Sequence, residues 1–116
     1  MMGEPKSKGR PRFTRQGHAY TPKETREAEV AVLLAWELSG GQVLNGPLVI
    51  KCEFYVGTKR RKDTDNMLKL ILDALNRKAF ADDDQIVRID AVKRYTTPGK
   101  ARTVVKIFQE MEVVYE

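Results

Sequence analysis

The stretch LVIKCEFYV, residues 48–56, constrains the fold more than any other segment because its side chains alternate with a period of two. Apolar side chains occupy every even position of the stretch, and the odd positions include Lys51 and Glu53. Alternation of this kind predicts a β-strand with one buried face. Such a strand needs neighbouring strands at its edges and a helix or a second sheet over its apolar face.

A first helix is predicted upstream of this strand. Thr21 is the expected N-cap, Pro22 occupies the first helical position, and Glu24 completes a capping box. The glycines at 40–41 end the helix. Residues 30–38 are apolar on most sides, which is expected either for burial in the core or for contact with a second subunit.

The rest of the chain predicts one further helix and two further strands. The helix runs from about 65 to 78, and its apolar stripe consists of Leu68, Ile71, Leu72 and Leu75. Strands are expected at about 85–96 and 102–109, joined as a hairpin by a turn over residues 97–100. This order of elements predicts an α+β fold in which two helices cover one face of a small mixed sheet.

The length of 116 residues suits one compact domain, and we expect residues 1–20 to form a basic arm or loop of it. Positive charge is concentrated in that arm and in residues 59–62, within a chain of formal net charge +5 and pI near 9.4. Separated basic clusters favour nucleic acid as the partner over a small acidic metabolite, although basic tails are often simply solvated.

Composition excludes two classes of protein. The single cysteine, Cys52, rules out an internal disulfide and cannot by itself form a thiolate metal site, which indicates a reducing, cytoplasmic setting. The longest apolar run, residues 30–36, is too short to span a bilayer, so no membrane association is expected.

Acidic residues also occur in two sets, Asp63 with Asp65 and the run Asp82–Asp84. Clustered like charges destabilise a fold unless a cation neutralises them, and Mg2+ is held by a few carboxylate oxygens together with water and phosphate. Carboxylates beside cations therefore suggest phosphodiester chemistry. The alternative is structural: Asp63 or Asp65 caps the second helix, and residues 82–84 form a solvated turn.

The run RRKDTDNMLKLILDALNRKAFADDDQI resembles the signature of the RusA family of Holliday junction resolvases. That signature consists of a basic run, D-x-D-N-x-x-K, a D-A-L helix, and D-D-x-Q followed by an apolar residue. The segments KGRPRFTRQGHAYTPKETREAE and GKARTVVKIF also resemble parts of the family, so the similarity extends from about Lys8 to Phe108.

The resemblance implies a RusA-like fold and a Mg2+-dependent endonuclease that acts as a homodimer on four-way DNA junctions. It implies that Asp63, Asp65 and Asp83 are metal ligands, with Asp82 as an extra ligand. It also implies that Lys69 assists catalysis. For Lys69, an ordinary ion pair with Asp65, four residues earlier on the helix, is the structural alternative.

The sequence departs from the family pattern in two places. The family helix usually ends in glycine soon after D-A-L-N, but residues 77–79, RKA, follow Asn76 here. The expected first strand is also mostly absent from residues 1–7. The sheet therefore has one strand fewer, or residues 111–116, MEVVYE, form an edge.

Chain length suggests that one chain alone does not form the site. A helix from Asp65 to Lys78 is about 20 Å long, whereas the four residues 79–82 span at most about 14 Å. Asp83 is therefore not expected to reach back to Asp65. The expected solution is that Asp63 and Asp65 of one subunit meet Asp83 of the other, which gives two composite sites related by a twofold axis.

Basic side chains are the predicted contacts to DNA phosphates, independent of sequence and sensitive to salt. They are Arg10, Arg12, Arg15, Lys59, Arg60, Arg61, Lys62, Lys93, Arg94, Lys100 and Arg102. His18 is expected at the surface, and Phe13 and Tyr20 either pack in the protein or stack on unpaired bases.

These features predict a Mg2+-dependent endodeoxyribonuclease that resolves Holliday junctions by paired symmetric nicks in DNA recombination and repair. Two alternatives remain. One is a noncatalytic dimeric DNA-binding protein whose acidic residues only cap helices and face solvent. The other is a nuclease for flaps or other branched DNA.

Overall fold

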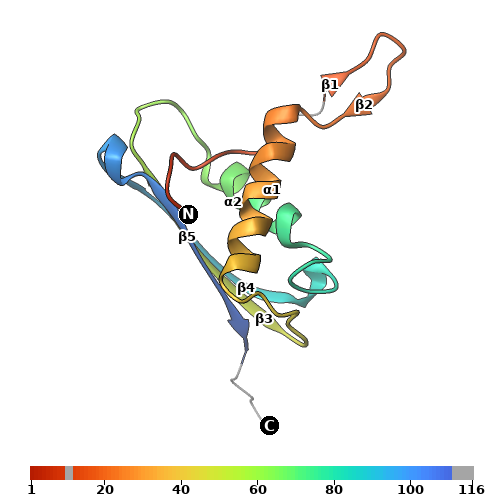
Figure 1. Cartoon of the computed structure of the whole chain (residues 1–116), viewed down its shortest axis with the longest axis vertical. Helices are drawn as coiled ribbons and strands as arrows, with labels where there is room; N and C mark the ends of the chain where they lie inside the picture. Colours follow the sequence, from red (N-terminus) through yellow and green to blue (C-terminus); the bar gives the residue numbers. More distant parts are fainter. Residues whose placement is uncertain (10–11, 111–116) are drawn as a thin grey trace.

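The computed structural model describes residues 1–9 and 12–110. Two helices lie on one face of a three-stranded sheet, and a short hairpin projects from the body (Figure 1). The elements are β1 (Arg12–Phe13), β2 (Ala19–Tyr20), α1 (Lys23–Leu38), β3 (Leu48–Val56), α2 (Thr64–Leu75), β4 (Ile86–Tyr95) and β5 (Arg102–Gln109), with 3-10 turns at Asp83–Gln85 and Pro98–Lys100. The predicted α+β class is confirmed.

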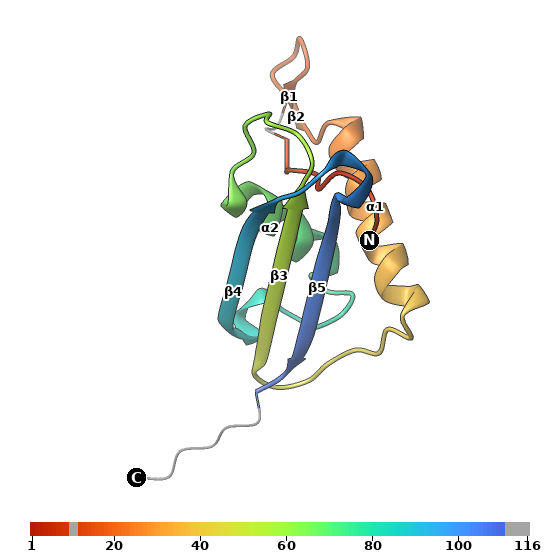
Figure 2. The ribbon, with the colours of Figure 1, turned by 90° about the vertical axis from the view of Figure 1, so that its left-hand side faces the viewer.

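The strand order of the sheet is β4-β3-β5, with β3 parallel to β4 and antiparallel to β5 (Figure 2). The prediction that the last two strands pair as a hairpin is wrong, because β3 lies between them. Their connection crosses the end of β3, where the Thr96 amide donates to the Val56 carbonyl oxygen at 2.9 Å. Gly57 permits the crossing, since a Cβ there would lie 2.6 Å from Cα of Pro98.

The central place of β3 follows from its apolar side chains. Every even position from Leu48 to Val56 is at most 1% exposed, and Val49 on the other face is also buried. By contrast, residues 87–90 of β4 are exposed. A strand that is buried on its helix-facing side and paired at both edges suits the middle of the sheet.

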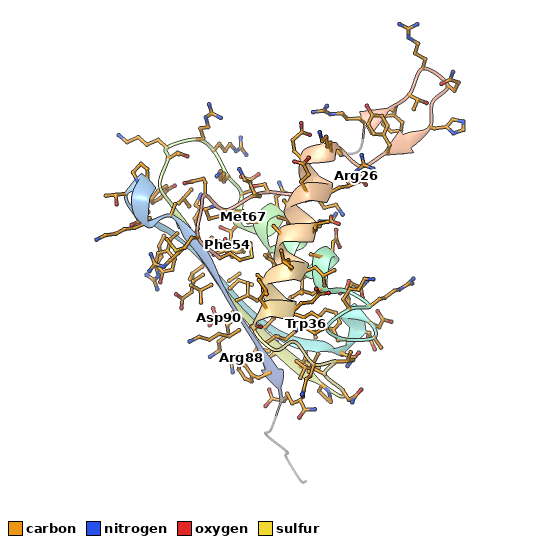
Figure 3. All side chains as sticks on the ribbon, in the orientation of Figure 1. Arg26, Trp36, Phe54, Met67, Arg88 and Asp90 are labelled. Atoms are coloured by element: carbon orange, nitrogen blue, oxygen red, sulfur yellow. The ribbon has the colours of Figure 1, made fainter. Side chains whose placement is uncertain are left out.

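The predicted apolar stripe of α2 is only partly correct. Ile71 and Leu75 are buried, but Leu68 and Leu72 are only partly buried. The fully buried side of the helix is Met67, Leu70, Ile71, Ala74 and Leu75. The stripe is displaced because α2 packs against α1 as well as against the sheet, and Met67 meets Phe54 of β3 between the layers (Figure 3).

The helix α2 ends at Leu75, three residues before the predicted end. Arg77 has a φ of +64°, the left-handed conformation that is usually taken by glycine after a helix. The chain then turns so that Asn76 bridges to Phe80 and the Phe80 side chain is buried. Burial of this aromatic ring offsets the backbone strain at Arg77, which explains why α2 ends earlier than predicted.

The predicted capping box of α1 is absent from the described structure. Pro22 is the N-cap residue, and no side chain caps the helix end. The hydroxyl of Thr25 instead accepts a bond from the Gly9 amide at 3.0 Å, which holds the arm against the helix. The predicted end at the glycines is confirmed, since Ser39 is the C-cap and Gly40 has a φ of +87°.

The apolar half of α1 is divided between two environments. Val32 is buried and Trp36 packs against the core, whereas Val30, Leu34 and Leu38 are exposed along one stripe. In the described residues, no helix is both long and apolar enough to cross a bilayer.

The first residues run along the outer edge of β5. The Thr103 amide donates to the carbonyl oxygen of Met1 at 2.9 Å, and Met2 forms a single antiparallel bridge with Arg102. This bridge is all that the described structure contains of the expected first strand. The edge predicted for residues 111–116 lies outside the described residues.

Candidate active site

The first acidic set lies at the beginning of α2. Asp63 is the N-cap residue, yet its carboxylate makes no capping bond, and its side chain is 46% exposed. Its Oδ1 lies 3.4 Å from Nε of Arg61. Asp65 is exposed, and its Oδ1 accepts the Asn66 amide at 2.9 Å. Both residues are therefore exposed, with Arg61 beside Asp63, and the helix-capping alternative is not supported for Asp63.

Lys69 lies one helical turn beyond Asp65 and is exposed. The ion pair with Asp65 that was the structural alternative does not occur among the described residues. An ion pair with Asp65 therefore does not account for the lysine at position 69. Its catalytic role stays a prediction.

A further turn along α2, Asp73 forms an ion pair with Lys8 of the arm, and both side chains are half-buried. The Lys8 amide also donates to the Asn66 carbonyl oxygen at 3.1 Å. Sequence analysis missed Asp73 as part of the acidic region. The only available signal was its spacing of eight residues from Asp65, because its partner lies 65 residues away in the chain.

The second acidic set forms a 3-10 turn before β4. Asp82 acts as its cap, because its Oδ1 accepts the Asp84 amide at 3.3 Å. Gln85 completes the turn by accepting the Ala81 and Asp82 amides at 2.8 and 3.1 Å. The alternative that residues 82–84 form a solvated turn thus fits Asp82, and its role as the cap leaves this carboxylate less available as an extra metal ligand.

Asp83 differs from its neighbours in this turn. Its exposed carboxylate makes no hydrogen bond or ion pair with the part of the chain that the structure describes. Partial burial raises the pKa of Asp83, and the charges of Asp73 and Asp82 raise it further. Asp83 is thus a carboxylate without an intramolecular cation, which suits it to bind one from outside.

The two acidic sets do not converge within one chain. Among residues 1–9 and 12–110, no group of three acidic, histidine or cysteine side chains is placed to hold a metal ion. Asp63 and Asp65 lie at the beginning of α2, whereas Asp83 follows the chain reversal at its other end. This separation agrees with the chain-length argument.

A network of partly buried hydrogen bonds and one ion pair holds the basic loop, residues 59–62, that leads to Asp63. The Lys62 ammonium lies 3.3 Å from Glu4 and donates to the Pro5 carbonyl oxygen at 2.7 Å. The Glu4 carboxylate also accepts the Gly57 amide at 3.0 Å, and Lys93 donates to the Lys62 carbonyl oxygen at 2.9 Å. We call Glu4, Gly57 and Lys62 the loop clamp. Lys62 and Lys93 thus have internal partners, and their predicted contacts to DNA stay predictions.

The other predicted phosphate contacts differ in exposure. Arg102 is partly buried, with its guanidinium 3.8 Å from the ring centre of Tyr55. Arg10 lies outside the described residues. The exposed members of the set are Arg12, Arg15, Lys59, Arg60, Arg61, Arg94 and Lys100. The projecting hairpin adds an exposed His18 together with Phe13 and Tyr20, which are 67% and 46% exposed.

Exposed carboxylates at the beginning of α2 and in the turn before β4, with a basic loop next to the first of them, define a candidate phosphodiester-cleaving site on a small α+β scaffold. The family model described as Endodeoxyribonuclease RusA matches residues 2–108. The crossover junction endodeoxyribonuclease RusA of Shigella sonnei is 33% identical over 94 residues, which cover 80% of this chain and 72% of the relative. The Escherichia coli K12 protein of the same name is 32% identical with the same coverage.

The chain therefore belongs to the RusA family of endodeoxyribonucleases.

Proposed function

We propose that this protein is a Mg2+-dependent, homodimeric endonuclease that resolves four-way DNA junctions by paired symmetric nicks during recombination and repair. The observation that carries the proposal is the placement of Asp63, Asp65 and Asp83, whose carboxylates face solvent, with Asp63 beside Arg61 of the basic loop. The names of the relatives, crossover junction endodeoxyribonucleases, support the junction as the substrate. We place the protein in the cytoplasm, where the thiol of Cys52 stays reduced.

The donor set fits Mg2+ in its chemistry. Asp63, Asp65 and Asp83 offer hard carboxylate oxygens, and their side chains are not consumed by internal ion pairs except for the long contact of Asp63 with Arg61. Bound Mg2+ would lower the pKa of an attacking water and neutralise charge that develops on the phosphate. Because the three carboxylates do not meet in one chain, the complete donor set requires two chains.

The protein's own side chains have separable roles in this proposal. Lys69 stabilises charge on the scissile phosphate through its exposed ammonium. The exposed loop cations Lys59, Arg60 and Arg61 hold the DNA backbone next to Asp63. Asp82 shapes the turn that presents Asp83 and is at most an additional ligand.

Two composite sites related by a twofold axis match a four-way junction, whose own approximate twofold symmetry allows paired cuts. A direct test mixes two inactive variants, Asp65→Asn and Asp83→Asn. In a heterodimer of the two, one composite site combines both substitutions and the other combines the intact Asp65 with the intact Asp83. Mixing should therefore restore up to one nick per heterodimer on a labelled junction in Mg2+.

The matched control pairs Asp65→Asn with a second preparation of itself, which should stay inactive at every ratio. Asp84→Asn, an exposed neighbour in the same turn, should retain cleavage. Activity that is absent in both variants and not restored by mixing would refute the shared site. Full cleavage by either variant alone would refute the ligand assignment.

The two alternative functions predict other results. A noncatalytic DNA-binding protein would bind the junction in Mg2+ and leave the strands intact. A nuclease for other branches would cut flaps or three-way forks faster than four-way junctions in a panel of labelled substrates. Asp65→Asn separates binding from cleavage, because removing a negative charge near phosphate should preserve or strengthen junction binding while cleavage is lost.

A further inference from the structure

The hairpin formed by β1 and β2 leaves two aromatic rings in solvent. Every residue from 12 to 21 is exposed, and Phe13 and Tyr20 are 67% and 46% exposed. An isolated two-stranded hairpin is only marginally stable, and an aromatic ring stabilises a fold mainly through the area that it buries. Packing within the described chain therefore does not explain these two rings, which points to a partner outside it.

The register of the hairpin places the two rings on opposite faces. Arg12 pairs with Tyr20, and Phe13 pairs with Ala19. Residues directly opposite each other in an antiparallel pair share one face of the ribbon, and successive residues alternate between the faces. One face thus carries Tyr20 beside Arg12, and the other carries Phe13 beside the small Ala19. The ribbon has an aromatic surface on each side.

The base of the hairpin is fixed next to the first acidic set. On the incoming side, the Lys8 amide donates to the carbonyl oxygen of Asn66, in the first turn of α2, at 3.1 Å. The Gly9 amide donates to the Thr25 hydroxyl at 3.0 Å. On the outgoing side, the chain passes through the buried Pro22 directly into α1. The hairpin therefore projects from a fixed base, at the same end of the molecule as the basic loop (Figure 1, Figure 2).

Charge favours nucleic acid as the partner of this hairpin. The sequence has no acidic residue between Glu4 and Glu24, and the described hairpin carries Arg12 and Arg15. Neither arginine forms an ion pair with any described residue. Cations next to exposed aromatic rings bind the backbone and the bases of nucleic acid respectively.

We propose that the hairpin is a wedge that enters the centre of branched DNA and stacks an aromatic ring on a base at each side, so that it selects branched DNA over duplex. The inference rests on the proposed function, to which it adds the element that recognises the branch. In a duplex, every base pair is stacked on both faces, so inserting a side chain has an unstacking cost. Where the arms of a junction meet, base pairs at the ends of the arms are free to part, and this cost is smaller.

The thickness of the wedge also favours a branch point over a duplex. A strand ribbon with side chains on both faces is about 10 Å thick, from the spacing of stacked sheets. Consecutive bases on one strand of a duplex are about 3.4 Å apart, so the wedge is about as thick as three stacked bases. A gap of this size requires two helices to part, which is the arrangement at the centre of a junction.

The reach of the hairpin places the branch close to the proposed site. Phe13 is four residues from Gly9, and Tyr20 is two residues from Pro22, which span at most about 14 and 7 Å. Both rings thus lie within about four base spacings of the fixed base beside the first acidic set. A wedge at the branch would hold the scissile phosphate within a few nucleotides of it.

Binding without cleavage tests the wedge. The parent protein and its variants are titrated in EDTA with a labelled four-way junction and with a duplex of the same arm sequence. Phe13→Leu and Tyr20→Leu should each weaken junction binding about tenfold, because stacking on one base is lost, and should change duplex binding by less than about twofold. Phe13→Trp should keep the junction affinity of the parent, since tryptophan keeps a ring and leucine keeps only apolar character. Both positions are exposed, so the variants should fold as the parent does.

Two control variants separate stacking from other effects. Phe108→Leu removes another exposed aromatic ring, on β5, and should leave both affinities unchanged. Arg15→Gln should weaken binding to the junction and to the duplex by the same factor and reduce the salt dependence of both, because it removes only a phosphate contact.

Photocrosslinking locates the rings on the DNA. A 5-iodouracil base that stacks on an aromatic side chain forms a crosslink to it on irradiation. With this base at the branch point, the parent protein should crosslink through residues 13–15 or 16–23, the tryptic peptides that contain Phe13 and Tyr20. The same base placed one helical turn away from the branch should give no crosslink to these peptides.

Four results would each overturn the wedge: equal affinity of the parent for junction and duplex, leucine variants whose preference for the junction is that of the parent, crosslinks to the hairpin only away from the branch, or leucine variants that lose self-association and keep junction binding. The last result would show that the hairpin packs against protein. The proposed function fails separately. A protein that selects the junction through Phe13 and Tyr20 but cuts no DNA in Mg2+ would refute the function alone. Mg2+-dependent junction cleavage by the double leucine variant, with the junction preference of the parent, would refute the wedge alone.

Discussion

Replacing Glu4 tests whether the loop clamp, Glu4, Gly57 and Lys62, holds the basic loop that precedes Asp63 in place. The Glu4 and Lys62 side chains are only 22% and 16% exposed, with 3.3 Å between Oε1 and Nζ. At an effective dielectric constant of 20, two charges at this distance attract by about 5 kcal/mol, and much of this is offset by their desolvation. The Gly57 amide also donates to the two carboxylate oxygens of Glu4, at 3.0 and 3.2 Å. A hydrogen bond to a charged acceptor of this kind stabilises the fold by about 1.5–3 kcal/mol.

We therefore expect Glu4→Ala to lower the free energy of unfolding by about 2–3 kcal/mol, because it leaves the Gly57 amide without its acceptor and the Lys62 ammonium without its charged partner. Glu4→Gln keeps an oxygen for Gly57 and should cost about half as much. Urea denaturation followed by circular dichroism gives the values, and with an m-value of about 1–3 kcal/mol/M the alanine variant should lower the midpoint by about 1–2 M.

A double-mutant cycle isolates the ion pair within the clamp. Lys62→Met alone should also destabilise the protein, but after Glu4→Gln it should cost about 1–2 kcal/mol less, because its partner charge is already gone. Additive losses in the cycle, or a change below about 0.5 kcal/mol for Glu4→Ala, would refute the clamp. Junction cleavage by Glu4→Gln should fall as well, since the loop that orients Asp63 loses a tether.

Two further predictions concern stability. The raised pKa of Asp83 means that ionising this group opposes folding, so its contribution is most favourable at low pH and is lost as the pH rises through the folded-state pKa. Asp83→Asn should thus be more stable than the parent by about 0.2–1 kcal/mol at pH 7, and a gain that persists below about pH 4 in thermal unfolding would contradict this. Gly57→Ala should destabilise by about 1–3 kcal/mol because its Cβ meets the Pro98 backbone, whereas Gly99→Ala, with open space around it, should be nearly neutral in the same urea assay.

The elements that sequence analysis located well are those with strong local signals. The alternation over residues 48–56 gave the bounds of β3, and the bounds of β5 were also correct. The pairing of the strands was not predictable in the same way. The turn over 97–100 has a hairpin signal. However, β3 lies between the other two strands because it has the most apolar face, and this depends on the packing of the whole sheet and not on any local signal.

The site shows a similar limit. Local motifs located the acidic residues, and the chain-length argument anticipated that Asp65 and Asp83 stay apart in one chain. Neither the local motifs nor the chain-length argument could predict contacts between segments that are distant in the chain. The pairing of Lys8 with Asp73 and of Glu4 with Lys62 spans 65 and 58 residues, and no periodicity or spacing rule links such positions.

The central position of β3 affects the order in which the chain can fold during synthesis. Both strands that pair with it are translated later, and the last of them ends at Gln109, 53 residues after Val56. At a translation rate of about 5–20 residues per second, both neighbouring strands have been synthesised only about 3–11 seconds after β3. The nascent chain is most prone to aggregate during that interval. The elements able to cover the apolar face of β3 in that time are α1, which is translated before it, and α2, which is translated next.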